Sequence, residues 1–329
     1  MRLEVSREQV PLSAPFVITG YTFTHVPVVV VRLSDGAAAG LGEAAGVYYL
    51  GDDAGHMCAA IESVRGAIEA GADREELRRL LPCGGARNAL DCALWDLEAK
   101  RSGQPVWRLA GLEPPRPLVT TYTVSADEPE AMAAKATGYA DARAVKLKLT
   151  GDPALDSERV RAVRRARPDV WLAVDANQGY QAGTLAEIMP ALTGCKVKLL
   201  EQPLPRGQEA AMEGLRCPMP VAADESVQGL ADVEPLVGRF DVVNIKLDKC
   251  GGLTEALAMV ALARRLGLGV MVGNMVGTSL AMAPAWILGQ LCDLRDLDGT
   301  LFIARDRAPA ISFEGGAVSY PPRGWGAPA

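Results

Sequence analysis

From residue 118 onward the chain alternates short apolar, β-branched runs with stretches of helical periodicity, and this pattern repeats eight times. Strands that alternate with helices form parallel βαβ units, whose crossovers cover the sheet with helices. Eight such units within roughly 180 residues favour an α/β fold of the TIM-like (β/α)-barrel type. The length is short for eight full units, so we expect a modified barrel that lacks one outer helix or completes its last unit only partly. The strand candidates are 118–124, 144–150, 170–177, 197–203, 220–226, 241–248, 269–275 and 295–299.

The residues before position 113 follow a different pattern. Period-2 alternation is interrupted at Ser34-Asp35-Gly36, which predicts an antiparallel sheet with a turn at this point. Helical periodicity follows over residues 54–70 and 86–100, and Gly103 ends the second helix. We therefore expect an α+β domain over residues 1–115, the barrel over 116–300, and a tail over 301–329 that packs back on the first domain.

Composition excludes several classes of protein. A net charge of −6 and a pI near 5.2 argue against nucleic-acid binding, and no apolar run reaches the ~20 residues that span a bilayer. The N-terminus lacks the apolar region of a signal peptide, so we expect a cytoplasmic protein. Seven scattered cysteines without a CxxC pair indicate small buried side chains rather than zinc ligands or disulfides. The two histidines, His25 and His56, leave none for the barrel.

Charged side chains recur where the barrel strands are expected to end. They are spaced 27, 26, 23 and 22 residues apart, one βα unit each, in the order Lys148, Asp175, Glu201, Asp224 and Lys246. Because reactive groups of such barrels lie at the C-terminal ends of the strands, these side chains should meet at one mouth. A salt bridge at the barrel rim explains any one of these acids equally well, but it does not explain the whole series.

Three of these side chains predict a metal site. Carboxylates that converge on one point repel one another unless a cation lies between them. Oxygen ligands favour a hard ion, and Mg²⁺ suits a site with few carboxylates. We predict one Mg²⁺ held by Asp175, Glu201 and Asp224.

The lysines predict proton transfer. Lys146 and Lys148 are two residues apart on one strand, so both should point into the barrel mouth. A second ammonium nearby moves a lysine pKa toward neutral and makes the amine a usable base. Lys246 should lie across the barrel, and two bases on opposite faces of one carbon permit 1,1-proton transfer beside a carboxylate. Mg²⁺ and Lys146 would stabilise the resulting enediolate.

Five motifs together resemble the enolase superfamily, and more narrowly its muconate-lactonizing subgroup. They are KxK at 146–148, VDAN at Asp175, EQP at Glu201, ADES at Asp224 and NIKLDKCGG around Lys246. The resemblance covers essentially the whole chain, including an N-terminal capping domain. It implies that Asp175, Glu201 and Asp224 are magnesium ligands and that Lys148 and Lys246 are the acid/base pair. The absence of a barrel histidine fits this lysine–lysine type and not the histidine-based racemases.

Two regions bear on the substrate. Asp296 and Asp298 form a DxD at the last strand, which resembles the dipeptide epimerases, where this motif binds the N-terminal amine. A solvated loop, a helix N-cap or a turn is the alternative. In the 20–25 loop, Tyr21, Phe23 and His25 replace the arginine of the Ala-Glu epimerase pattern and favour an aromatic or otherwise different substrate side chain. The segment 46–53 is a further candidate for lining the barrel mouth. The alternative for both this segment and the 20–25 loop is an ordinary surface loop.

Three functions remain open. The first is epimerisation of a dipeptide at its C-terminal residue. The second is racemisation of N-acyl or N-alkyl amino acids, or a lyase or cycloisomerase reaction of the o-succinylbenzoate synthase or lactonizing type. The third, a non-catalytic binding protein, conflicts with the intact lysines and acids. In each case the expected partner is a small-molecule substrate that carries a carboxylate, such as a dipeptide. We expect binding neither to nucleic acid nor to a membrane. Homo-oligomers are common among capped barrels of this type, so a homo-oligomer is possible.

Overall fold

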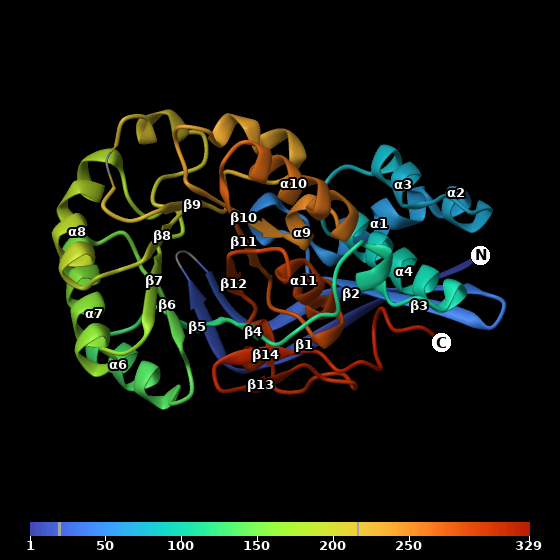
Figure 1. Cartoon of the computed structure of the whole chain (residues 1–329), viewed down its shortest axis with the longest axis horizontal. Helices are drawn as coiled ribbons and strands as arrows, with labels where there is room; N and C mark the ends of the chain where they lie inside the picture. Colours follow the sequence, from blue (N-terminus) through green and yellow to red (C-terminus); the bar gives the residue numbers. More distant parts are fainter. Residues whose placement is uncertain (19–20, 216) are drawn as a thin grey trace.

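The computed structural model describes residues 1–18, 21–215 and 217–329. Its largest sheet holds eight parallel strands in chain order, curled around a centre with helices outside (Figure 1), which confirms the predicted barrel and all eight strand candidates. The strands are β5 (Thr121–Val124), β6 (Ala144–Lys148), β7 (Trp171–Asp175), β8 (Leu199–Glu201), β9 (Val221–Ala223), β10 (Val242–Lys246), β11 (Gly269–Gly273) and β12 (Leu294–Asp296).

Side chains close the barrel between its first and last strands. Thr120 Oγ1 accepts a hydrogen bond from Leu297 N at 2.8 Å, and Thr123 N donates to Asp298 Oδ2 at 2.6 Å. Thr121 Oγ1 donates to Asp296. These bonds hold both acids of the DxD motif at the barrel mouth.

The outer layer is reduced on one side of the barrel. In the described residues, the connections from β8 to β9 and from β9 to β10 contain only 3₁₀ turns, η2 (Glu209–Met212), η3 (Leu230–Asp232) and η4 (Glu234–Leu236). The shortening therefore affects two outer helices rather than one, and the last unit is incomplete as expected, because β12 is followed in the described residues by a 3₁₀ turn and no α-helix. The other connections carry α6 (Pro129–Gly138), α7 (Pro153–Ala166), α8 (Ala182–Gly194), α9 (Leu247–Cys250), α10 (Leu253–Arg265) and α11 (Ser279–Gly289).

The N-terminal part combines a meander with helices, as predicted. Its sheet runs β1 (Arg2–Ile18), β2 (Tyr21–Asp35), β3 (Ala38–Ala44), with the expected turn after Asp35. The helix α4 ends where predicted, since its C-cap Gly103 has a φ of 67°. The remaining elements are η1 (Tyr48–Leu50), α1 (Ala54–Ser63), α2 (Arg65–Ala70), α3 (Arg74–Leu80), α4 (Gly85–Ser102) and α5 (Val106–Leu109).

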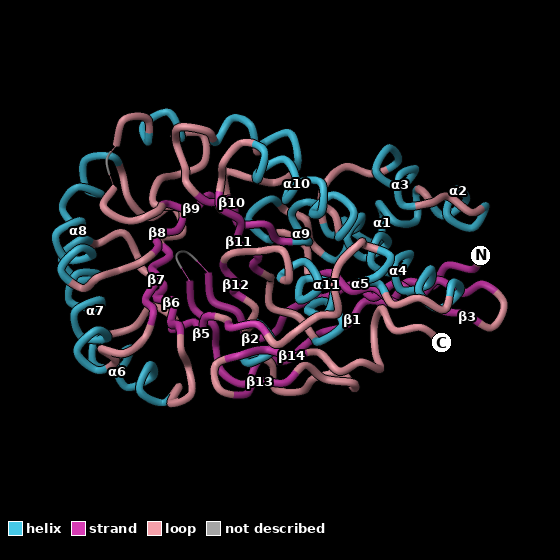
Figure 2. The backbone as a smooth tube through the Cα atoms, in the orientation of Figure 1, coloured by secondary structure: helices cyan, strands magenta, loops and turns pink. Residues whose placement is uncertain are grey.

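Strand β2 joins two apolar cores. Val28 and Val30 belong to the large core shared with the barrel, whereas Val29 and Val31 belong to the core of the N-terminal part. Successive strand residues point to opposite faces, so a continuous apolar run is needed when both faces are buried. The β1–β2 hairpin consequently extends from the N-terminal helices to the barrel strands (Figure 2).

The last residues contact both parts of the molecule. After η5 (Gly299–Phe302), β13 (Ser312–Glu314) and β14 (Ala317–Ser319) form a small sheet with β4 (Leu118–Val119). The 118–124 run is thus split, and only its second half belongs to the barrel. Trp325 Nε1 donates to Leu41 O at 2.9 Å and to Cys92 O at 3.1 Å.

Two sequence expectations concern the whole chain. All seven cysteines are free, but Cys83 is exposed and Cys58 and Cys217 are only half-buried, so the predicted burial holds for the other four. Cys83 lies just before α4, and Arg87 of that helix donates a hydrogen bond to the Cys83 sulfur at 3.0 Å. Among the helices that the structure describes, none has the length and apolarity that a membrane crossing requires.

Candidate active site at the barrel mouth

A cavity of about 330 Å³ lies where the strand ends meet the N-terminal part. The barrel contributes Lys146, Lys148 and Lys246 to its lining, all from the ends of β6 and β10. The segment 46–53 contributes Tyr48 and Tyr49, so its expected place at the mouth is confirmed. The two lysines of the KxK motif both face this cavity, as their spacing predicts.

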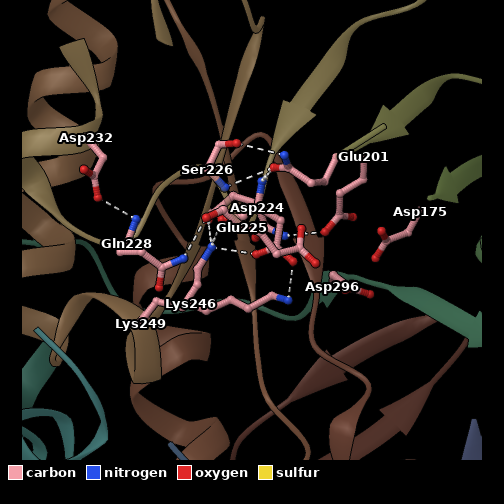
Figure 3. A network of polar contacts seen from close by, with 12 residues as sticks. Asp175, Glu201, Asp224, Glu225, Ser226, Gln228, Asp232, Lys246, Lys249 and Asp296 are labelled. Carbon is pink, nitrogen blue, oxygen red and sulfur yellow. Dashed lines mark hydrogen bonds and ion pairs between the residues drawn. The ribbon is translucent and has the colours of Figure 1, made fainter. Parts of the chain in front are cut away.

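Strand register brings three acids together. Lys148 pairs with Asp175, and Asp175 pairs with Glu201, so neighbouring strand ends lie at one height. Asp175, Glu201 and Asp224 are buried, and each offers a carboxylate oxygen within 4.8 Å of the others. Figure 3 shows the three side chains turned toward one another. The residues two positions earlier form an apolar layer beneath them, with Ala173, Leu199 and Ala222 among its members.

Ammonium groups surround this acid cluster. Lys148 Nζ contacts Asp175 Oδ2 at 2.6 Å, and Lys246 Nζ contacts Asp224 Oδ2 at 2.6 Å. These two lysines come from β6 and β10, with the acids of β7, β8 and β9 between them in the sheet order. The expected position of Lys246 across the barrel is therefore confirmed.

Two further lysines are buried against the same acids. Lys146 Nζ lies 3.3 Å from Glu201 Oε2 and 3.6 Å from Asp175 Oδ2, and it contacts Asp296 more closely. Lys249 Nζ contacts Asp224 Oδ1 at 2.6 Å (Figure 3). The three acids thus have counter-charges within the protein, which the repulsion argument from the sequence did not include.

This compensation is incomplete at the centre of the cluster. Burial and the neighbouring Asp175 raise the pKa of Glu201 to about 7, although Lys146 and Lys246 lower it. At Asp224 burial also acts to raise the pKa, but Lys246 and Lys249 hold it well below its usual range. An added cation would therefore favour the ionised form of Glu201.

The pKa of Lys146 is raised, whereas the sequence hypothesis expected a neighbouring ammonium to lower the lysine pKa. Burial lowers the pKa of Lys146, but Asp296, Glu201 and Asp175 together raise it well above its usual value. The pKa of Lys246 is raised in the same way by Asp224 and Glu201, against the effect of burial. Carboxylates, not the neighbouring ammonium, dominate the surroundings of both lysines.

The residues of the cluster fit a divalent metal ion. All three converging ligand atoms are carboxylate oxygens, the donors that Mg²⁺ prefers. Around them, three buried acceptors have no hydrogen-bond partner among the described residues: Asn177 Oδ1, Glu225 Oε2 and Asn244 Oδ1. Buried acceptors need donors, and Mg²⁺ usually keeps several bound waters that supply them.

Residues that sequence reasoning missed hold the acids in place. Asn244 Nδ2 donates to Glu201 Oε1 at 2.8 Å. Gln202 Oε1 accepts from Asp224 N at 2.9 Å and from Ser226 N at 3.1 Å, which ties β8 to the loop after β9. A signal for Asn244 exists, because it lies two residues before Lys246 and so points to the same face. Gln202 gives no such signal, since its partners lie on another strand.

Two family models match the chain along most of its length. Residues 1–111 match the N-terminal domain of the mandelate racemase / muconate lactonizing enzymes, and residues 130–327 match the enolase C-terminal domain-like model. The chain belongs to the mandelate racemase / muconate lactonizing enzyme family. The predicted membership of the enolase superfamily is thereby confirmed.

Several similar proteins are named as dipeptide epimerases, and another, from Pseudoalteromonas sp., is an N-acetyl-D-glutamate racemase that is 40% identical over 74% of this chain and 76% of its own length. The L-Ala-D/L-Glu epimerase of Escherichia coli K12 is 42% identical over 96% of this chain and 98% of its own length. An enolase family member from Agrobacterium tumefaciens, with bound sodium and L-Ala-L-Glu, has a TM-score of 0.94 at 42% identity and 98% coverage of both chains. The dipeptide epimerase of Cytophaga hutchinsonii, with Mg and D-Ala-L-Val, has a TM-score of 0.90 at 27% identity, covering 97% of this chain and 92% of that one.

The residues predicted to contact substrate lie in different places. Asp296, Asp298 and Phe23 line the cavity. His25 is exposed beside Thr24, and it is not among the described residues of the cavity lining. The side chain of Tyr21 lies outside the described part of the chain.

Glu225 is a cavity residue that the motifs did not single out. It is buried, lines the cavity, and accepts a hydrogen bond from Asn177 Nδ2 at 3.3 Å. Burial and the nearby Asp224 raise its pKa to about 8. The ADES motif contains this glutamate, but the strand spacing predicted only the preceding Asp224 as a site residue.

Proposed function

We propose that this family member catalyses the Mg²⁺-dependent epimerisation of a dipeptide at the α-carbon of its C-terminal residue. The observation that carries the proposal is the pair Lys148 and Lys246, which line one cavity with the acid cluster between their strands. Two amines on opposite faces of one carbon permit inversion, because one removes the proton and the other returns a proton to the far face. The name of the E. coli relative and the dipeptides bound in two solved neighbours support the same reaction.

The proposed steps use the protein's own side chains. Asp175, Glu201 and Asp224 would hold one Mg²⁺, which neutralises the substrate carboxylate and stabilises charge that develops beside it. One lysine, as the neutral amine, takes the α-proton, and the electron pair of the broken C–H bond spreads toward the carboxylate. The other lysine, as ammonium, donates its proton to the opposite face. One C–H bond replaces another, and only the configuration changes.

Lys146 has a separate role in this proposal. Its Nζ lies among three carboxylates, those of Asp296, Glu201 and Asp175, and we assign it the role of an ammonium ion throughout the reaction. A buried positive charge beside the cavity stabilises the negative charge that reaches the substrate carboxylate. Lys146 thus acts through its charge and does not transfer a proton.

Asp296 and Asp298 are the proposed site for the free ammonium of the N-terminal residue. Both are buried and line the cavity. Burial and the charge of Asp296 raise the pKa of Asp298 to about 7, and a bound ammonium would stabilise its ionised form. An N-acyl amino acid lacks this ammonium, so the acids favour a dipeptide over the substrate of an N-acyl amino acid racemase.

The domain division is part of the same proposal. Residues 1–115 would cap the barrel of residues 116–300, with the tail of 301–329 packed back on the cap. In this arrangement Tyr21 and Phe23 belong to the hairpin of the cap and are the candidate contacts for the substrate side chain, whereas His25 is exposed outside the described cavity lining. A cytoplasmic location and a homo-oligomeric state stay predictions from the sequence.

Proton NMR in D₂O tests the proposal directly. The protein is incubated with Mg²⁺ and a small dipeptide library, and the α-proton signal of each C-terminal residue is followed. We expect loss of that signal together with the appearance of a second diastereomer. Exchange of N-acyl or N-alkyl amino acids without exchange of any dipeptide would assign the racemase alternative instead, and exchange of neither class would reject both.

A further inference from the structure

Part of the cavity wall is apolar and is assembled from separate segments of the chain. The β1–β2 hairpin contributes three side chains, and η1, the loop after β11 and η5 contribute one each. We call these residues the apolar wall: Leu12, Phe23, Val26, Tyr48, Val276 and Phe302. The barrel side of the same cavity holds the lysines and acids described above.

Contacts between the segments hold this wall together. The rings of Phe23 and Tyr48 meet edge to face, with centroids 5.3 Å apart and planes at 70°. Ser13 Oγ donates to Phe302 O at 3.1 Å, and Leu12 forms a bridge with Ile303. Edge-to-face rings at this separation attract each other, so the hairpin, η1 and η5 form one continuous surface.

The cations of the cavity are already engaged. Among the described residues, the cavity lining contains three lysines and no arginine: Lys146, Lys148 and Lys246. Each of these lysines contacts a carboxylate of the barrel. Residues 16–21 have the sequence Phe-Val-Ile-Thr-Gly-Tyr and therefore add no cation. These lysines lie on the barrel side of the cavity, so a carboxylate on a substrate side chain packed against the cap would lose its hydration with no lysine or arginine beside it among the described lining residues.

The acids on the cap side are engaged as well. Asp52 accepts from Gly85 N at 2.7 Å, and Asp53 accepts from Gly55 N at 2.7 Å and His56 N at 2.9 Å. These carboxylates cap α1 and orient the chain before α4, so they satisfy backbone groups. Among the described lining residues, the cap side thus offers an apolar surface without lysine or arginine, and its two acids bind backbone groups.

We infer that the residue epimerised by this protein carries an apolar side chain, aromatic or branched aliphatic, which packs against the apolar wall. The inference rests on the proposed function and adds the substrate class to it. An apolar side chain that leaves water for such a surface gains affinity, whereas an acidic one does not. This preference differs from the glutamate in the name of the E. coli relative.

The first test compares substrates on the wild-type protein loaded with Mg²⁺. The value of kcat/KM is measured for L-Ala-L-Phe, L-Ala-L-Leu, L-Ala-L-Glu and L-Ala-L-Lys. We expect the Phe and Leu dipeptides to exceed the Glu and Lys dipeptides by roughly 10- to 200-fold, the range over which apolar pockets discriminate. A higher kcat/KM for the Glu or Lys dipeptide would overturn the inference and leave the proposed function intact.

The second test introduces a cation into the wall. Phe23→Arg should raise kcat/KM for L-Ala-L-Glu and lower it for L-Ala-L-Phe, mainly through KM, because the change affects side-chain binding and not the lysines. Thr24→Arg is the matched control, because Thr24 is exposed and is not among the described residues that line the cavity. Phe23→Leu, which keeps the surface apolar, should retain the preference for apolar dipeptides.

Three outcomes separate the two proposals. An unchanged substrate order in Phe23→Arg, with circular dichroism like the wild type, would remove the apolar wall from substrate recognition. If Phe23→Arg does not fold, the wild-type comparison and Phe23→Leu still decide the inference. Exchange of no dipeptide at all would reject the proposed function, and the inference about its substrate with it.

Discussion

At the scale of single residues, the molecule places two similar lysines in two different positions. Lys148 contacts Asp175 on one side of the acid cluster, and Lys246 contacts Asp224 on the other. If each amine serves one face of the substrate, removing one should abolish inversion without abolishing proton removal from the face that remains. This asymmetry distinguishes two bases from a single base assisted by water.

We therefore predict that Lys148→Ala and Lys246→Ala each lower the rate of epimerisation at least about 10³-fold, within the range for acid–base groups. Each variant should still exchange the α-proton of one diastereomer, and the two variants should act on opposite diastereomers. Proton NMR in D₂O measures both quantities. A variant that still exchanges both diastereomers at the wild-type rate would show that the missing lysine is not a base.

Glu201 supports a prediction about the metal. The pKa of this buried acid is raised to about 7, so its ionised form destabilises the protein when no cation compensates it. Glu201→Gln should keep or raise the melting temperature without Mg²⁺ and should abolish the stabilisation by Mg²⁺. In the wild type this stabilisation is about 2.7 kcal/mol when Mg²⁺ is at 100 times its Kd.

Differential scanning calorimetry with and without Mg²⁺ measures this effect. The control is Glu234→Gln, which removes an exposed glutamate from η4 and should retain the full response to Mg²⁺. A Mg²⁺-dependent rise in the melting temperature of Glu201→Gln equal to that of the wild type would remove Glu201 from the metal site.

At the scale of elements, the close packing of β3 on α4 depends on glycine. A side-chain carbon built on Gly42 would lie 2.0 Å from Ala89 O, and one on Gly40 would lie 2.1 Å from Ala93 O. Both neighbours are backbone atoms of α4, which cannot move aside without shifting the helix. Because β3 also pairs with β2, the strand cannot retreat either.

Gly42→Ala should therefore lower the free energy of unfolding by about 3 kcal/mol, at the upper end of overpacking costs. Urea unfolding followed by circular dichroism provides the measurement. Gly66→Ala is the matched control, because it lies in α2 with open space around its α-carbon and should raise stability by up to about 1 kcal/mol. Equal stability of Gly42→Ala and wild type would contradict the tight contact between β3 and α4.

At the scale of the whole molecule, two side chains of α4 connect the cap to the barrel. Arg87 lies over Gly251 and donates to Cys250 O, and Asp91 lies over Gly252 and accepts from Thr254 N at 3.1 Å. Both glycines have positive φ, 81° and 111°, and a side chain on either would collide with α4. The two glycines of the NIKLDKCGG motif thus serve the contact between cap and barrel.

Asp91 makes this contact sensitive to pH. Burial raises its pKa from 3.8 to about 6, so the folded protein holds a proton that the unfolded chain has released. The stability contributed by this proton is fully present below about pH 3.8 and is lost as the pH rises through about 6. A difference of roughly two pKa units corresponds to about 3 kcal/mol at most.

We predict that Asp91→Asn flattens the dependence of unfolding free energy on pH between about 4 and 6. Urea unfolding at several pH values compares the slopes of the two proteins, and the wild type should show the steeper fall in stability with rising pH. Parallel slopes would mean that Asp91 ionises with an ordinary pKa in the folded state. Because Asp91 lies on α4 and not among the acids of the mouth, added Mg²⁺ should leave this difference unchanged.

Much of this architecture could be predicted from local patterns. All eight barrel strands were located, since strands of a parallel sheet are buried on both faces and read as apolar runs. The 118–124 run was misread as one strand, because its division between β4 and β5 depends on the tail sheet far along the chain. The loss of two outer helices rather than one also escaped prediction, as 3₁₀ turns carry little periodicity.

Spacing along the chain is enough to predict which charged side chains meet at the barrel mouth. Each βα unit returns the chain to the same end of the barrel, so spacings of 22 to 27 residues were enough to bring Lys148, Asp175, Glu201, Asp224 and Lys246 together. The partner of each charge, in contrast, depends on how the strands pack in three dimensions. Lys146 contacts Asp296, 150 residues away, across a seam that exists only when the first and last strands meet. Spacing along the chain gives the order of the strands. The charged neighbours of each lysine depend on which strands lie next to one another in the closed barrel.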